Sequence, residues 1–278
     1  MQTPYIPNTY TNTTWWRIVL AAMLSIALGS CSSFDKIMKS KDYEYKYQMA
    51  LKYYAARDHA HYLMLLESIQ PIYRSTMRAD TVDFYICEGN YYQGDYLLAA
   101  HYYDRFRKTF TRSPFTEQAE YMYAYCYYKA APRAELDQSN TMAALAAFAE
   151  YLSRFPNTPH KADIKRYVNE LNDRLIEKSY LSAKLYYDMG NYKSALVALR
   201  NSVNQYPNSK YREEQMFLIL RSAYLLADNS VRSKKRERLQ STIDEYYNFA
   251  SEYPASRYSS SAKHIYESCT KALDKYKD

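Results

Sequence analysis

The apolar positions of this chain recur every three or four residues along most of its length, which predicts amphipathic helices. Four of the predicted helices end alike, with an aromatic residue followed three positions later by Ser or Thr. These segments are Phe110-Thr-Arg-Ser113, Phe155-Pro-Asn-Thr158, Tyr206-Pro-Asn-Ser209 and Tyr253-Pro-Ala-Ser256, and their aromatic residues are 45, 51 and 47 positions apart. Proline ends a helix and Ser or Thr caps the next one, so the pattern predicts a repeated pair of helices.

The repeat indicates which helices form pairs. Second helices of the later units are expected over residues 96–110, 141–155, 192–206 and 239–253, and the first unit over 43–56 and 59–74. In the fourth unit, the packing positions of the tetratricopeptide (TPR) motif fall on Ala183, Tyr186, Ala195 and Leu199, and Gly190 falls in the turn. Repeats of roughly 30 to 50 residues made of helix pairs are typical of solenoids. The predicted fold class is all-α, a TPR-like helical-hairpin solenoid of about five repeats with a C-terminal capping helix.

One stretch has the period of a strand, because tyrosines alternate at 121, 123, 125 and 127. Neighbouring alanines and the phase of the repeat favour a helix instead. On that helix Tyr121, Tyr125 and Tyr128 share one face, and Tyr123 and Tyr127 share another.

Composition supports a helical chain. The sequence has 278 residues with only four glycines and nine prolines but 35 tyrosines, and hairpins between strands need Gly or Asn-Gly turns. The net charge of +7 is a mild excess for this length and is not the footprint of a nucleic-acid-binding protein.

The N-terminal segment has the features of an export signal. Arg17 precedes the uncharged, almost wholly apolar stretch 18–28, which leads into Leu28-Gly29-Ser30-Cys31. The order Leu, small, small, Cys resembles a bacterial lipoprotein signal, which implies cleavage before Cys31 and lipid on its thiol and amine. An ordinary signal peptide and a transmembrane anchor are the alternatives. The anchor is disfavoured, because the stretch is shorter than the ~20 apolar residues that span a bilayer.

These features divide the chain. Residues 1–30 are expected to be a lipoprotein signal peptide, residues 31–41 a lipidated N-terminus and short tether, and residues 42–278 the solenoid, with halves of about 42–160 and 161–278. Residues 161–189 contain neither Gly nor Pro and predict one long helix that bridges the halves, and residues 132–140 predict a long loop.

No catalytic or cofactor motif is present. The sequence has no Gly-rich phosphate loop, no H-E-x-x-H and no G-x-S-x-G, and its five histidines are scattered. We therefore expect no cofactor, no metal and no enzyme activity. Three cysteines remain after Cys31, namely Cys87, Cys126 and Cys269, and none has C-x-x-C spacing. Buried thiols are the expected role, while pairing of Cys87 with Cys126 stays open.

A candidate peptide groove follows from the phase of the repeat. The first helices of units one and two are expected to turn six side chains toward the inner face of the solenoid: Tyr47, Leu51, Tyr54, Phe84, Glu88 and Tyr91. Aromatic rings bind peptides at low cost in entropy, although they also serve as packing between helices.

The cleavage box, the TPR-like units with Y-P-N-S ends and the long helix together resemble the BamD family of outer-membrane lipoproteins. The resemblance is strongest at Phe155-Pro-Asn-Thr-Pro-His-Lys-Ala-Asp-Ile-Lys-Arg166, Asn172-Asp-Arg-Leu175 and Tyr186-Tyr187. It implies a lipid-anchored, non-catalytic scaffold on the periplasmic face of the outer membrane, which binds a BamA-like barrel protein and unfolded outer-membrane proteins. The family's partner-binding arginine has no residue in register, and Arg200, two positions away, is the candidate contact.

Two other classes fit parts of the pattern. SusD-like glycan-binding lipoproteins also combine a lipid anchor, TPR helices and exposed aromatic residues, but they are about twice as long. Their usual sugar platform, tryptophan, occurs here only at Trp15 and Trp16, inside the signal. A generic periplasmic TPR adaptor is the third hypothesis.

Overall fold

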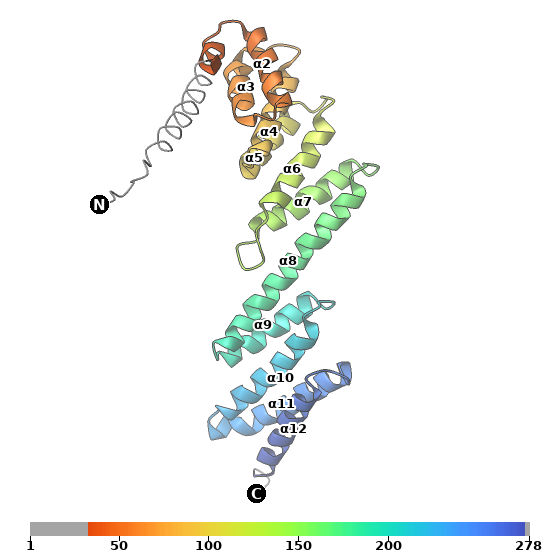
Figure 1. Ribbon diagram of the computed structural model, residues 1–278. Helices are drawn as coiled ribbons and strands as arrows, with labels where there is room; N and C mark the ends of the chain where they lie inside the picture. Colours follow the sequence, from red (N-terminus) through yellow and green to blue (C-terminus); the bar gives the residue numbers. More distant parts are fainter. Residues whose placement is uncertain (1–32, 276–278) are drawn as a thin grey trace, which may run out of the picture. The chain divides into compact units, whose positions relative to one another are not determined.

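The computed structural model describes residues 33–275, and every regular element in that range is a helix (Figure 1). The predicted cleavage box and Cys31 lie outside the described residues. The helices in chain order are α2 (Tyr43–Ala55), α3 (His59–Tyr73), α4 (Ala79–Tyr92), α5 (Tyr96–Thr109), α6 (Thr116–Ala130), α7 (Ser139–Arg154), α8 (Lys161–Asp188), α9 (Tyr192–Gln205), α10 (Arg212–Asp228), α11 (Arg232–Glu252) and α12 (Ser259–Asp274).

The predicted helix ends are confirmed to within two residues, with one exception. Helix α11 begins at Arg232, seven residues before the expected start at Leu239. Its first two turns are exposed and mostly charged, so they have no apolar period from which a helix is predicted. The strand-like tyrosine run is helical: Tyr121 stacks on Tyr125, and Tyr123 contacts Tyr127.

The chain divides into two compact units. Unit 1 is Met1–Ala130 with Ser153–Phe155, described from residue 33 on, and unit 2 is Ala131–Leu152 with Pro156–Asp278, described to residue 275. The division therefore lies near residue 130 rather than near the expected 160.

The reason for this division is that α7 and the loop before it belong with α8. The ring of Phe148 on α7 stacks on Tyr167 of α8, with centroids 6.0 Å apart. Arg174 of α8 donates to the carbonyl of Ala131 at 2.9 Å, and Lys178 donates to the carbonyl of Glu135 at 2.8 Å. The long α8 thus contacts α7 through this ring pair and packs on α9.

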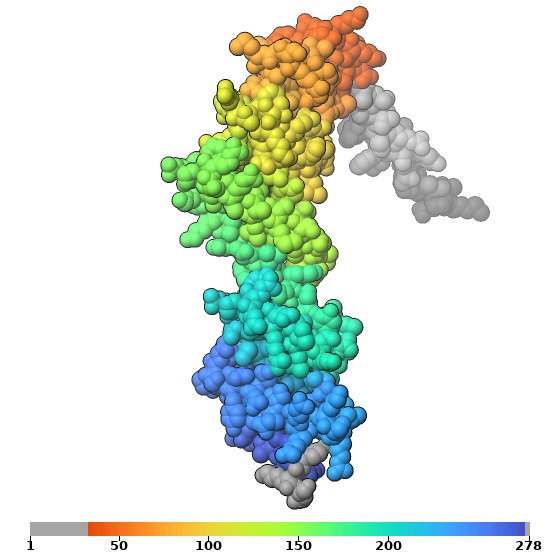
Figure 2. Space-filling view, turned by 180° about the vertical axis from the view of Figure 1, so that it is seen from behind, coloured from red at the N-terminus to blue at the C-terminus, as the bar shows by residue number. Residues whose placement is uncertain are grey.

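Each apolar core is shared by three successive helices. In unit 1 the cores join α2, α3 and α4, then α4, α5 and α6. In unit 2 they join α8, α9 and α10, then α10, α11 and α12. The first helix of one pair thereby closes the core of the pair before it, as in a TPR-like solenoid. Successive helices within each unit are in continuous contact (Figure 2).

Small residues sit where paired helices cross. Ala99 and Ala195 have no exposed surface, as the repeat predicts. Of the four TPR packing positions, Ala183, Ala195 and Leu199 are buried. Tyr186 is 44% exposed, and its neighbour Tyr187 packs against the core instead.

Stacked aromatic rings join the first helix of one pair to the start of the next pair's first helix. Phe84 stacks on Phe115 with ring centroids 4.6 Å apart and an interplanar angle of 14°. Tyr180 stacks on Tyr211 at 4.3 Å and 2°, and Phe217 stacks on Tyr258 at 4.4 Å and 6°. The same contact therefore recurs in both units.

The Ser and Thr residues of the repeated turns act differently from the prediction. Ser113, Ser209 and Ser256 are not the N-cap residues, because the helix starts later and each hydroxyl accepts from the N–H two positions on, at 2.9–3.2 Å. Two of these hydroxyls also donate back to the preceding pair. Ser113 donates to Asp80 at 2.8 Å and Ser256 to Glu213 at 2.6 Å, each acid being one turn before the stacked aromatic residue.

The expected tether at residues 31–41 is wrong over its described part. Residues 33–38 are helical, and Phe34 and Ile37 are buried in the first core of unit 1. The ring of Phe34 lies 4.1 Å from that of His61, centroid to centroid. Burial of two large apolar side chains holds this segment to the domain.

No helix in the stretch 33–275 is long and apolar enough to cross a lipid bilayer.

The turns inside three helix pairs place one residue in the left-handed region. Gly94 has φ +86°, Gly190 has φ +75° and Arg57 has φ 59°. A side chain in this region costs about 1–2 kcal/mol, which glycine avoids. A Cβ added at Gly190 meets nothing closer than the Tyr192 hydroxyl oxygen at 4.0 Å, so backbone strain is the only penalty there.

We predict that Arg57→Gly raises the free energy of unfolding by up to about 1 kcal/mol, because it relieves this strain. Gly190→Ala should lower it by roughly 1–2 kcal/mol. Urea unfolding followed by circular dichroism measures both. Changes of the same sign would show that the turn conformation is not what sets these energies.

Candidate peptide-binding surface

Two of the six expected groove residues are core residues. Phe84 is 2% exposed because its ring forms the stacked contact with Phe115, so it faces the next helix pair rather than solvent. Tyr47 is 8% exposed and stacks on Tyr73 at 5.8 Å. The two corrections have different causes: Phe84 contacts the next helix pair, whereas Tyr47 packs on the second helix of its own pair.

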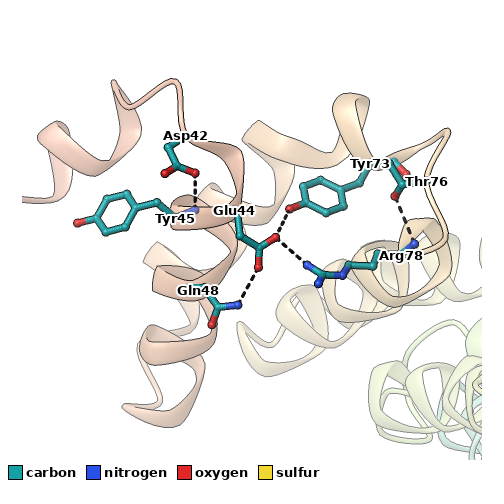
Figure 3. A network of polar contacts seen from close by, with 7 residues as sticks. All are labelled: Asp42, Glu44, Tyr45, Gln48, Tyr73, Thr76 and Arg78. Atoms are coloured by element: carbon teal, nitrogen blue, oxygen red, sulfur yellow. Dashed lines mark hydrogen bonds and ion pairs between the residues drawn. The ribbon is translucent and has the colours of Figure 1, made fainter.

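The guanidinium of Arg78 lies over the ring of Tyr47. Arg78 belongs to a polar network that joins α2 to the turn between α3 and α4 (Figure 3). Glu44 accepts from Gln48 at 2.9 Å, from the Tyr73 hydroxyl at 3.1 Å and from Arg78 at 2.7 Å. The Gln48 hydrogen bond first, and then Tyr73 and Arg78, hold the pKa of Glu44 below its usual value. The network orients the start of α2.

The other four expected residues, Leu51, Tyr54, Glu88 and Tyr91, are half-buried. Two of them belong to a continuous series of rings on α2, α4 and α6 of unit 1. We call this series the tyrosine row; its members are Tyr54, Tyr92, Tyr91, Tyr125, Tyr121 and Tyr128.

Neighbouring rings of the tyrosine row are in contact. Centroid distances are 6.1 Å from Tyr54 to Tyr92, 5.4 Å from Tyr92 to Tyr91 and 6.2 Å from Tyr91 to Tyr125. On α6, Tyr125 stacks on Tyr121 at 5.8 Å and on Tyr128 at 5.6 Å. Tyr92 is 45% exposed and the other members are half-buried, so each ring keeps accessible surface.

One end of the row borders a pocket. Its lining is formed by Tyr54, Ala55, Arg57, His59 and Tyr92. The ring of His59 stacks on Tyr92 at 4.5 Å. The pocket therefore has aromatic walls with a basic side chain at its rim.

Glu88 is the carboxylate of this surface, and its pKa is shifted into the physiological pH range. Burial among the rings raises its pKa to about 7. Burial also raises the pKa of Tyr54 and Tyr91 above the ordinary tyrosine value, so their hydroxyls stay neutral. Neutral phenols both donate and accept hydrogen bonds.

Several row members were absent from the expected groove. The surface also includes Tyr92, Tyr125, Tyr121 and Tyr128. The sequence contained a signal for the last three, because they share one face of the predicted helix. Contacts between α4 and α6 depend on tertiary packing.

Arg200, the candidate partner contact, lies on α9 of unit 2. It forms an ion pair with Glu245 of α11, and its side chain is 48% exposed. The pair ties α9 to α11 and leaves part of the guanidinium accessible.

The three described cysteines, Cys87, Cys126 and Cys269, are buried free thiols. Within residues 33–275, no group of three or more His, Cys, Asp and Glu side chains is placed to hold a metal ion. The candidate surface is therefore built from aromatic rings and one carboxylate.

Comparison with known proteins supports the resemblance. The YfiO family model, described as outer membrane lipoprotein, matches residues 39–225 and 177–277. The outer membrane protein assembly factor BamD of Neisseria meningitidis serogroup B is 27% identical over 233 residues, covering 76% of this chain and 85% of that protein. The BamD of Caulobacter vibrioides is 27% identical over 122 residues, covering 44% of this chain and 40% of that protein, so the match spans under half of that relative.

Among solved structures, the chain matches the TPR2AB-domain:pHSP90-complex of yeast Sti1. It is 12% identical, has a TM-score of 0.39, and the match covers 82% of this chain and 98% of that chain.

We predict that Glu88→Gln stabilises the protein at pH 8 by about 1–3 kcal/mol and that the gain shrinks near pH 5. The pKa of Glu88 is about 7 in the folded protein and 4.5 in the unfolded chain, so the folded protein loses stability as the pH rises from the lower value to the higher one. Gln does not titrate and therefore causes no such loss. Urea unfolding at the two pH values tests this. A gain that is independent of pH would contradict it.

Proposed function

The chain belongs to the YfiO family of outer membrane lipoproteins, and from this membership we propose that it is a non-catalytic scaffold for the assembly of outer-membrane β-barrel proteins. In this role it holds a BamA-like barrel protein and receives unfolded outer-membrane proteins. Relatives that match 75–76% of this chain are named outer membrane protein assembly factors. The observation that carries the client-binding role is the tyrosine row of unit 1.

The geometry of the row suits an extended peptide. Neighbouring rings that join the helices α2, α4 and α6 lie 5.4–6.2 Å apart. This spacing is close to the ~6.6 Å that separates alternate side chains on one face of a strand. Aromatic faces bury such side chains at low cost in entropy, and neutral hydroxyls satisfy backbone groups of the bound segment.

We place the lipid anchor at Cys31, which lies outside the described residues. The structure limits the reach of this anchor, because Ser33 begins a helix and Phe34 is already in the core of unit 1. Two residues of extended chain span only about 7 Å. The start of unit 1 is therefore held close to the membrane surface.

The proposed partner contact is in unit 2. Arg200 is half exposed, and its ion pair with Glu245 leaves N–H donors that an acidic group of a BamA-like partner can use. An arginine is suited to such a site because its planar fork binds carboxylates in two-point geometry.

Truncation of row residues should weaken client binding. We expect Tyr54→Ala to raise the Kd for a fluorescent C-terminal strand peptide of a barrel protein roughly thirty-fold, since an aromatic anchor contributes about 2 kcal/mol. Fluorescence anisotropy with the full chain in detergent measures this.

The matched control is Tyr45→Ala. Tyr45 is 45% exposed on α2, nine positions before Tyr54 and therefore on the opposite face of the helix. Equal weakening by the control, or no binding by the wild type, would overturn the peptide site. Tight oligosaccharide binding without peptide binding would favour the glycan-binding alternative.

Replacement of the proposed anchor residue should release the protein from the membrane. We expect Cys31→Ala to abolish labelling by a fatty-acid probe and to move the protein out of the outer-membrane fraction, because lipid attachment needs the thiol. Persistent labelling of the variant would place the anchor elsewhere.

A further inference from the structure

The tyrosine row has a carboxylate in its middle. Glu88 lies on α4, one helical turn from Tyr85, Tyr91 and Tyr92 and therefore on their side of the helix. It is half-buried, so part of the side chain reaches solvent.

Glu88 has no hydrogen bond or ion pair to any residue that the structure describes, and no cation offsets its burial. Nearby carboxylates of unit 1 are paired. Asp83 accepts from Gln70 at 2.6 Å and lies 3.9 Å from Arg105, and Asp104 pairs with Arg107 and Lys108. Glu88 differs in this respect from Asp83 and Asp104, and it shares its lack of a partner with Glu67 of α3.

A half-buried anion without a partner is unfavourable, and a ligand that brings a positive charge removes this cost. Aromatic faces add to the attraction, because the negative face of a phenol ring binds ammonium and guanidinium groups. Tyr54 from α2 and Tyr91 and Tyr92 from α4 supply such rings beside the carboxylate.

We propose that Glu88, with the rings of Tyr54, Tyr91 and Tyr92, forms a subsite for a Lys or Arg side chain of an extended client segment. The inference rests on the proposed peptide site and narrows its ligands to segments in which a basic side chain lies two positions from an aromatic one. A free carboxylate at the same place is repelled.

Other titratable groups around Glu88 are tyrosines, namely Tyr54 from α2, Tyr62 from α3 and Tyr103 from α5, whose pKa values are raised by burial and which stay neutral. Tyr125 of α6 contacts Tyr91. Arg57 and His59 line the adjacent pocket.

The test compares two fluorescent peptides that are identical except for Lys or Gln at the position two residues from the aromatic one. Binding is measured by anisotropy with the full-length lipidated chain in detergent, at pH 8 and pH 6. We expect the Lys peptide to bind about tenfold more tightly than the Gln peptide at pH 8. The preference should shrink at pH 6, because Glu88 is then protonated.

The variants separate the causes. Glu88→Gln should abolish the preference for Lys while still binding the Gln peptide at least as tightly as wild type does. The matched control is Glu67→Gln, which removes a carboxyl on α3 whose pKa is likewise raised by burial. It should keep the preference. A pH-dependent preference for Lys that persists undiminished in Glu88→Gln would overturn the assignment of the subsite to Glu88.

Two failures are distinguishable. If neither peptide binds, the proposed peptide site itself is wrong. If both bind with equal Kd and binding still depends on Tyr54, the peptide site stands and the cation subsite is overturned. Tighter binding of a peptide with Glu at the test position would also overturn it.

Discussion

The stacking of an aromatic ring in one first helix on a ring at the start of the next is the contact on which the repeat depends. It recurs as Phe84 on Phe115, Tyr180 on Tyr211 and Phe217 on Tyr258, with interplanar angles of 14° or less. A helix pair alone cannot cover the far side of its first helix. The stacked ring covers it and also sets where the next helix begins, and in two of the three cases a hydroxyl-to-carboxylate hydrogen bond one turn away fixes the same junction.

This contact determines which residues remain for binding. Phe84, Glu88 and Tyr91 lie on one side of α4, because they are four and three residues apart. Phe84 is buried there by its stacked contact with Phe115, whereas Glu88 and Tyr91, farther along the helix, are half-buried and remain accessible. Tyrosine suits that intermediate position, because its ring packs against neighbours while its hydroxyl meets water. The abundance of tyrosine in this chain therefore follows from helices that are packed on several sides and still present a surface.

The two units have different features that bear on function. Unit 1 contains the tyrosine row and begins at a helix only two residues after Cys31, so the client surface and the proposed anchor belong to one body. Unit 2 contains α8, whose length lets it pack on α7 and on α9 in succession, and it contains Arg200 within an ion pair between α9 and α11. Membrane attachment and partner binding are thus proposed for different units.

The sequence alone was sufficient for the helices, the repeat, the long α8 and the resemblance to the family, because apolar period, proline and glycine positions and the cleavage box are local signals. It was not sufficient for the candidate surface. Helical phase places both Phe84 and Tyr54 on the expected inner face. Only packing shows that Phe84 is stacked in the core while Tyr54 is half-exposed. Helical phase gives the direction of a side chain but not what lies opposite it. The neighbours of Glu88 come from α2, α3 and α5, so the isolation of its carboxylate is a property that the tertiary structure alone decides.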